Sequence, residues 1–454
     1  MYKRDPKAAW GWIVTCLLIP TLGPVIYFLL GINRIRTRAK KLKSELPVNA
    51  EKSVSFSGEQ SAQPFEGFQN DPDLACMDNI SRDLSGLNLV DGNDVQIFLN
   101  GNEAYPAMLH DIGRAKQYVF LATYIFETNK TGLLFVEALS RAHKRGVDVR
   151  VMLDGIGEYY SWPSVGRYLK KAQIPFVRFL PPRLIPLSPF INLRNHRKML
   201  IIDGETGFTG GMNLGDRHIF DEKNAAGVQD IQFKFKGPVV SQMEEIFMED
   251  WAFSTGSHID KKTKIAYAGR YGSAVCRTFA IGPNQDKDKL RILYTGMISQ
   301  ARKSIHIMTP YFLPSQEIVG ALQAAALKGL DINIVLPAVN NLPFVHWATR
   351  NMLWEILQYG IKVYYQPAPF THSKLFLIDD EYSLVGSANM DPRSIRLNFE
   401  IVVEVYSKYL CARLKKHFHE KIARSEQVCL LDVDSRTISA RLRDSMCWLF
   451  TPYL

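Results

Sequence analysis

Two short stretches of the chain carry the same four polar residues at the same spacing. In each stretch a Lys follows a His by two positions, an Asp follows that His by seven, and an Asn follows it by seventeen. The two sets are His196, Lys198, Asp203 and Asn213, and then His372, Lys374, Asp379 and Asn389. A single His-x-Lys pair would more often be a packed or solvated part of a strand. Two copies with matching tails indicate two halves of one site.

These residue types suit the chemistry of phosphate esters. A His and a Lys two positions apart on a strand face the same side, so each imidazole has an ammonium group beside it. Glycines shortly before each Asn permit a tight turn that returns the amide to the same place. Ammonium and amide groups donate to the non-bridging oxygens of a phosphate, and an imidazole can attack phosphorus or protonate a leaving alkoxide. The two stretches together predict a phosphodiester site.

The motifs HRKMLIID at 196–203 and HSKLFLID at 372–379 resemble the HxKxxxxD motif of the phospholipase D superfamily. Within that superfamily the chain looks like the bacterial cardiolipin synthase branch. The similarity extends over roughly 94–407, and its clearest parts outside the motifs are 237–251, 389–394 and 397–400. The apolar end at 448–454 also resembles that branch.

Strands and helices alternate ahead of the first motif. We expect strands at 95–99, 118–122 and 147–153 and helices at 104–116 and 132–144. This order predicts a largely parallel sheet with helices on its faces. The order recurs after Lys289, where 302–311 matches 115–124 and 328–336 matches 145–153. One α/β unit therefore occurs twice.

Together with the resemblance, the repeat predicts an α/β fold of two phospholipase D-like lobes. Each lobe is expected to be a mainly parallel or mixed sheet flanked by helices, and a pseudo-twofold axis makes the motifs face each other. We place the lobes at 77–258 and 259–430. A membrane anchor at 1–43 and a flexible linker at 44–76 precede them, and an apolar tail at 431–454 follows.

The anchor prediction rests on Ala8–Ile32, an uncharged run of 25 residues with Trp10, Trp12 and Tyr27 near its ends. As a helix it would be long enough to cross a bilayer. A cleaved signal peptide is the competing interpretation, but basic residues follow the run where a small-residue cleavage site would stand. More basic residues follow it than precede it, so we expect the lobes on the cytoplasmic side of the bacterial inner membrane.

Pro20 and the Gly23-Pro24 pair interrupt the middle of this run. They leave two paths open: a kinked single span, or a re-entrant hairpin with both ends on one side.

Charge and cysteine content exclude other classes of protein. The first 43 residues hold nine basic residues against one acidic residue, whereas the net charge of the whole chain is +10. The lobes are therefore nearly neutral, which argues against a nucleic-acid partner. The six Cys form no CxxC pair, so neither a zinc site nor a disulfide framework is expected.

The resemblance implies a two-step displacement through a covalent phosphohistidine, without a metal or another cofactor. By analogy His196 is the nucleophile and His372 the general acid and base. The groups expected to hold the phosphoryl oxygens are Lys198, Lys374, Asn213 and Asn389.

Each imidazole also needs a carboxylate on its far nitrogen. In the family this acid follows the motif by 25 to 35 residues, which gives Asp230 and Glu400. The aspartates Asp203 and Asp379 belong to the catalytic motif, but we expect them to bond turns below the site. One departure from several family members is Val-Gln before Asp230 in place of Trp-Arg.

The function implied is that of a membrane-bound cardiolipin synthase, which joins two phosphatidylglycerol molecules and releases glycerol. Its partners would be phosphatidylglycerol, other phospholipids and the membrane. A phospholipase D that forms phosphatidic acid is the main alternative, because both reactions begin with the same intermediate. A superfamily nuclease and a non-enzymatic lipid-binding scaffold are weaker alternatives.

Overall fold

A computed structural model describes residues 6–27, 65, 67–68, 71–182, 193–220, 227–256, 269–283 and 288–451. The predicted linker and the basic segment that precedes it therefore lie largely outside the described residues.

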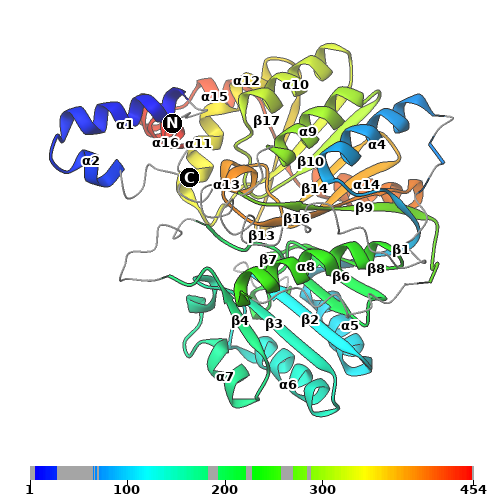
Figure 1. The fold of residues 1–454 in the computed structure, drawn as a ribbon. Coiled ribbons are helices and arrows are strands. Elements are labelled where there is room, and N and C mark those ends of the chain that lie inside the picture. Colours follow the sequence, from blue (N-terminus) through cyan, green and yellow to red (C-terminus); the bar gives the residue numbers. More distant parts are fainter. Residues whose placement is uncertain are drawn as a thin grey trace.

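One continuous fifteen-stranded sheet runs through the protein (Figure 1). The strands of its first half, in spatial order, are β1 (Val90–Leu99), β8 (Ile231–Lys236), β6 (Thr206–Gly210), β5 (Met199–Ile202), β2 (Tyr118–Thr123), β3 (Asp148–Asp154) and β4 (Phe176–Phe179). Those of the second half are β9 (Ala274–Ile281), β16 (Glu400–Tyr406), β15 (Tyr382–Gly386), β14 (Leu375–Ile378), β10 (Ser304–Met308), β11 (Asp331–Pro337), β12 (Lys362–Gln366) and β17 (Glu426–Val428). Apart from β17 the two orders correspond strand by strand, as expected for a duplicated unit.

The two halves join where β1 pairs antiparallel with β9. We call the halves, with their helices, the first and second lobe. The sheet continues from one lobe into the other, so the domain boundaries expected from the sequence stay predictions.

Of the two alternatives expected for the sheet, mainly parallel and mixed, the mixed one is confirmed and the largely parallel one is wrong. Parallel pairing joins β2 to β3, β3 to β4, β10 to β11 and β11 to β12. The neighbouring pairs that carry the motifs, among them β5–β6 and β14–β15, are antiparallel. Short turns connect these strands, and a short turn can join only antiparallel neighbours. The sheet is therefore mixed.

The elements expected before the first motif are present. The three strands are β1, β2 and β3, and the two helices are α5 (Asn100–Arg114) and α6 (Lys130–Lys144). Both helices bury apolar faces against β2 and β3 in a core that includes Ile112, Phe135 and Leu139. The other long helices of the lobes are α4 (Pro72–Ser85), α8 (Val239–Thr255), α9 (Lys289–Gln300), α10 (Gln316–Leu327), α11 (Pro343–Met352) and α14 (Lys408–Ile422).

The predicted match between 115–124 and 302–311 is wrong by one residue. Val119 pairs with Ile202, and Ile305 occupies the same place opposite Ile378. Both strands are buried on both faces, so neither has the alternation that would fix a register. The match between 145–153 and 328–336 is correct, because Asp148 and Asp331 begin equivalent strands.

The motif aspartates lie at the far ends of their strands and bond the backbone. The Asp203 carboxylate accepts from the backbone N–H groups of Lys116, Gln117 and Tyr118 at 2.8 to 2.9 Å. Asp379 accepts in the same way from the backbone N–H groups of Arg302, Lys303 and Ser304. Both residues have left-handed φ angles, +52° and +53°. These hydrogen bonds hold adjacent strands together, which is the arrangement expected for the two aspartates from the sequence.

The chain reverses direction near its N-terminus. Helix α1 (Pro6–Leu18) ends before a turn, and the short helix α2 (Gly23–Ile26) follows. The rings of Trp12 and Tyr27 meet with centroids 5.3 Å apart. Within the described residues no helix has the length and apolar character needed to cross a membrane.

At the other end of the chain the predicted tail forms α15 (Leu430–Asp434) and α16 (Ile438–Leu449). Helix α16 packs against α11 and leaves Leu442, Met446 and Leu449 exposed.

We predict that Asp203→Ala lowers the free energy of unfolding by about 3 kcal/mol, because three N–H groups lose a charged acceptor and Ala is strained at a left-handed φ. Asp203→Asn should lose less, since Asn tolerates that φ and keeps one acceptor oxygen. Thermal unfolding in detergent should rank the melting temperatures wild type, Asn, Ala. Wild-type melting of the Ala variant combined with abolished turnover would instead place Asp203 in the site.

Candidate active site

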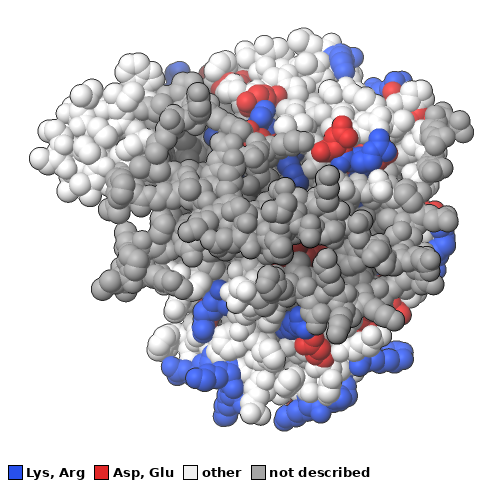
Figure 2. All heavy atoms as spheres, in the orientation of Figure 1, with Lys and Arg blue, Asp and Glu red and all other residues white. Residues whose placement is uncertain are grey.

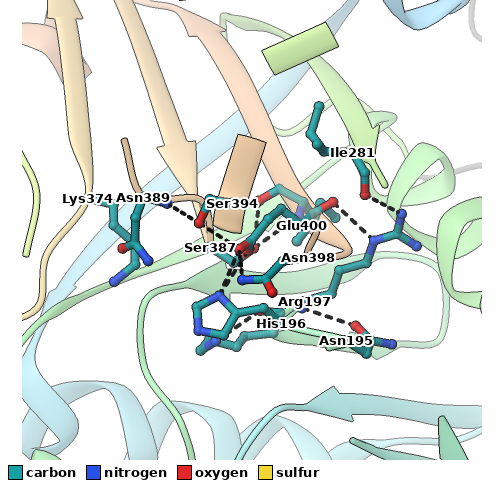
Figure 3. Close-up of polar contacts among 12 residues, drawn as sticks. Asn195, His196, Arg197, Ile281, Lys374, Ser387, Asn389, Ser394, Asn398 and Glu400 are labelled. Carbon is teal, nitrogen blue, oxygen red and sulfur yellow. Dashed lines mark hydrogen bonds and ion pairs between the residues drawn. The ribbon is translucent and has the colours of Figure 1, made fainter. Parts of the chain in front are cut away.

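The two motif histidines each bond a carboxylate of the opposite lobe. Figure 3 shows one of these pairs, His196 with Glu400. His196 Nδ1 lies 3.0 Å from both carboxylate oxygens of Glu400. His372 Nδ1 lies 2.8 Å from Asp230 Oδ2. The acid that follows each motif in the sequence thus serves the imidazole of the other motif. All four side chains are buried.

Backbone pairing across the lobes sets up these contacts. The His372 N–H donates to the Gln229 carbonyl at 2.7 Å, directly after β13 (Phe370–Thr371) pairs in parallel with β7 (Val228–Gln229). The His196 N–H donates to the Phe399 carbonyl at 2.9 Å in the equivalent arrangement. Each histidine is therefore held one position from the carboxylate that its ring bonds.

The motif lysines lie beside the histidines. Lys198 Nζ donates to the His196 carbonyl at 2.9 Å. Lys374 Nζ donates to the His372 carbonyl at 2.5 Å and also lies 3.2 Å from the His372 ring Nε2. Burial lowers the pKa of Lys198 to about 7 and that of Lys374 to about 8. Both ammonium groups lack the solvent that would stabilise their charge, so an anion between them would be bound favourably.

The motif asparagines are buried in the same region. Asn213 Oδ1 accepts from the backbone N–H of Ile125 at 3.2 Å. Asn389 Oδ1 is buried without a hydrogen-bond partner among the described residues. The backbone N–H of Asn213 donates to His218, and that of Asn389 donates to Ser394. The structure thus brings both asparagines to the site.

The two carboxylates differ in their surroundings. Glu400 accepts from Ser387 Oγ at 2.5 Å, Ser394 Oγ at 2.9 Å and Asn398 Nδ2 at 3.1 Å. Burial raises the pKa of Glu400, but the nearby charges of His196 and Lys198 and the hydrogen bonds outweigh this and lower it below its usual value. Glu400 is therefore a stable anion.

Asp230 has fewer donors. Besides His372 it accepts from the backbone N–H of Ile231 at 2.8 Å. Gly211 stands at the position equivalent to Ser387 and offers no hydroxyl; a Cβ there would lie 2.5 Å from both Asp230 oxygens. Burial raises the pKa of Asp230. The two half-sites therefore have the same arrangement of histidine and carboxylate, but Asp230 has fewer hydrogen-bond donors than Glu400, and the pKa values of the two acids shift in opposite directions.

Burial favours the neutral form of both imidazoles. Burial lowers the pKa of His196, with Glu400 opposing it. Burial and the charges of Lys374 and Lys198 lower the pKa of His372 well below its usual value. With Nδ1–H directed to a carboxylate, each ring keeps a lone pair on Nε2.

Several residues around the site were not assigned from the sequence: Gly211, His218, Ser387, Ser394 and Asn398. A signal for four of them was available, because Gly211 and Ser387 stand at the same offset from their motif histidines, as do His218 and Ser394. Because the residue types at these offsets differ between the two copies, comparison of the motifs did not reveal that the positions are equivalent.

Comparisons with known proteins agree with this geometry. A family model described as "Cardiolipin synthase, PLD-like domain" matches residues 108–251 and 294–422, and one described as "Phospholipase_D-nuclease N-terminal" matches 1–31. The chain is 31% identical to the major cardiolipin synthase ClsA of Bacillus subtilis, over 100% of this chain and 95% of that protein. A cardiolipin synthase of Clostridium perfringens is 29% identical over the same shares.

Among solved structures, the phosphatidylserine synthase of Haemophilus influenzae is similar with a TM-score of 0.65. The sequence identity is 14%, and the match covers 83% of this chain and 100% of that chain. At this identity the likeness concerns the fold.

We predict that kcat/KM for a phosphodiester falls as the pH rises through about 7 to 8. Lys198 and Lys374 lose their protons there, and the free site loses positive charge for the anionic substrate. In Lys198→Arg the guanidinium stays charged, so the descending limb should move toward higher pH. A limb unchanged in this variant would show that another group controls it. Rate profiles between pH 5 and 10 make the comparison.

We also predict that Gly211→Ala reduces turnover by about 100-fold, because its Cβ displaces the Asp230 carboxylate and misorients His372. Gly320→Ala is the matched control, since a Cβ at this position of α10 meets nothing within 4 Å. Turnover of purified variants with matched melting temperatures measures the effect. Equal activities of the two variants would contradict the packing argument.

Proposed function

The chain belongs to the cardiolipin synthase family of phospholipase D-like proteins, and we propose that it transfers a phosphatidyl group between two phosphatidylglycerol molecules to form cardiolipin and glycerol. The observation that carries this proposal is the single buried site built from two His-Lys-Asn sets with crossed carboxylates. The similarity to cardiolipin synthases over the full chain supports the lipid substrate.

In the first step His196 Nε2 attacks the phosphorus of one phosphatidylglycerol. A P–N bond forms, and the bond from phosphorus to the glycerol headgroup oxygen breaks. The anionic Glu400 stabilises the imidazolium that develops, as a carboxylate does in other histidine catalysts. Both lysines donate to the carbonyl of their own motif histidine, but Lys374 Nζ also lies 3.1 Å and 3.2 Å from the two ring nitrogens of His372. This contact is a further argument for His196 as the nucleophile.

His372 exchanges the protons. It protonates the departing glycerol oxygen, and it then takes a proton from a headgroup hydroxyl of the second phosphatidylglycerol. That oxygen attacks phosphorus, the P–N bond breaks, and His196 is restored. His372 needs a proton for the first transfer, and a phosphodiester anion beside Lys198 and Lys374 would supply the charge that raises its pKa.

Four donors hold the phosphoryl oxygens while negative charge builds in the transition state. Lys198 and Lys374 supply charge, and Asn213 and Asn389 supply amide N–H groups. These donors belong to rigid strands and turns, so little reorganisation accompanies the reaction.

The N-terminal residues 1–43 would anchor the protein at the bacterial inner membrane, with the lobes on the cytoplasmic side. The exposed Trp10, Leu17 and Leu18 of α1 support an apolar environment there. A nuclease function has less support, because most of the net positive charge lies in this anchor. On the face in Figure 2, Lys and Arg lie around the outer end of the first lobe and are mixed with Asp and Glu over the second.

The test is incubation of the purified full chain with phosphatidylglycerol in detergent micelles, with EDTA, followed by lipid mass spectrometry. We expect cardiolipin and glycerol from the wild type, and at least a 1,000-fold loss in His196→Ala and His372→Ala. His110→Ala, whose side chain is exposed on α5, is the control and should retain full activity. Phosphatidic acid as the sole product would reassign the protein as a phospholipase D.

The roles of the two histidines can be separated. In His372→Asn the first step proceeds without an efficient proton donor, and the intermediate cannot be resolved quickly. We expect an acid-labile phosphatidyl adduct on the residue-196 peptide in this variant and none in His196→Asn. Rapid-quench peptide mass spectrometry under alkaline conditions detects it. An adduct at residue 372 in His196→Asn would reverse the assignment.

A further inference from the structure

A third histidine lies beside the site in the first lobe. His218 ends the 3-10 helix η4 (Asp216–His218), and only 1% of its surface is exposed. Its ring centroid lies 6.5 Å from that of His372. Neither the motif nor the mechanism above uses it.

His218 occupies the position that Ser394 holds in the second lobe. Both residues accept a hydrogen bond from the backbone N–H of the motif asparagine: Asn213 donates to His218 Nε2 at 3.3 Å, and Asn389 donates to Ser394 Oγ at 3.1 Å. The two residues differ in their other hydrogen-bonding group. Ser394 also donates to Glu400, whereas His218 Nδ1 is buried with no partner among the described residues.

The hydrogen bond from the Asn213 N–H determines which ring nitrogen of His218 carries the proton. An N–H group can donate to Nε2 only if that nitrogen carries a lone pair, so the proton of the neutral ring is on Nδ1. Burial lowers the pKa of His218 to about 3, although Asp230 opposes it. The ring is therefore a neutral donor, and its Nδ1–H has no acceptor among the residues that the structure describes.

The chemistry of the neighbouring half-site indicates what that acceptor is. Lys198 and Lys374 already provide charged donors for the phosphoryl oxygens. His372 exchanges protons with the alcohol oxygen, so the rest of the alcohol must lie on its side of the site. The glycerol headgroup carries a second hydroxyl on the carbon next to the reacting position, and a neutral buried donor suits a neutral hydroxyl.

We propose that His218 Nδ1–H donates a hydrogen bond to this adjacent hydroxyl and thereby selects glycerol-type alcohols over water and simple alcohols. This inference rests on the proposed phosphatidyl transfer. His218 is then a specificity residue for the acceptor and the leaving group. A site that pairs with a substrate hydroxyl discriminates against analogues that lack it.

Competition for one intermediate isolates this effect. The full chain is incubated with phosphatidylglycerol and equal concentrations of deuterated glycerol and 1,3-propanediol, which lacks the central hydroxyl. Both alcohols and water react with the same phosphatidyl enzyme, so the product ratio is independent of the first step. We expect the wild type to prefer glycerol and His218→Gln to lose about tenfold of that preference.

Two further variants control the interpretation. His218→Asn places an amide nitrogen near the position of Nδ1 and should retain most of the preference. His218→Ser copies the second lobe, keeps an acceptor for the Asn213 N–H and lacks the Nδ1 donor, so it should behave like His218→Gln even if the Gln variant folds poorly. Melting temperatures are measured for all three variants.

Three results would overturn the inference. If His218→Gln and His218→Ser lower all transfer products equally, His218 acts through Asp230 and His372 as a positioning residue. If the preference for glycerol is unchanged, the ring is a packing group. If the wild type itself shows no preference, no subsite for the second hydroxyl exists. Failure of the proposed function is seen separately, as the absence of cardiolipin from wild-type samples without added alcohol.

Discussion

The site depends on two imidazole–carboxylate pairs that cross between the lobes. Neither lobe alone contains an oriented histidine, because the partner of His196 is Glu400 and that of His372 is Asp230. Crossed pairs require the lobes to be fixed relative to each other within the tolerance of a hydrogen bond. The junction of β1 with β9 and the short pairing of β7 with β13 meet this requirement. The continuous sheet therefore holds both crossed pairs in place.

Duplication placed equivalent residues at equivalent positions, and substitution then made the half-sites unequal. Ser387 and Ser394 hold Glu400 as an anion, whereas Gly211 and His218 at the same offsets leave Asp230 with fewer donors. A symmetric site would give both histidines the same basicity and no preferred direction of attack. The unequal donors provide a physical reason for one imidazole to act as nucleophile and the other to exchange protons.

Much of this arrangement could be predicted from the sequence. The offsets within the two motifs predicted the histidines, lysines and asparagines, and the family resemblance predicted the orienting acids. Alternation of strands and helices located the elements of the first lobe. The crossing of the carboxylates could not be predicted, because His196 and Glu400 are 204 positions apart in the sequence and local patterns carry no information on such pairing. The expectation of a largely parallel sheet and the predicted register of β10 were wrong for a related reason. Buried strands have no alternation of apolar and polar residues, and strand order is set by tertiary packing.

The free site contains buried lysines and buried polar atoms that could still bind a ligand. Two lysines whose pKa values burial lowers lie beside the crossed pairs. Near them, the amide oxygen of Asn389 and the Nδ1 of His218 have no hydrogen-bond partner within the part of the chain that the structure describes. Burying such groups costs free energy that the sheet and its cores must offset. A phosphodiester anion with a polyol headgroup would satisfy the cationic and neutral donors together. The donors are thus positioned when the protein folds. Under the proposed mechanism, the negative charge that develops at phosphorus would be stabilised by groups that need not move.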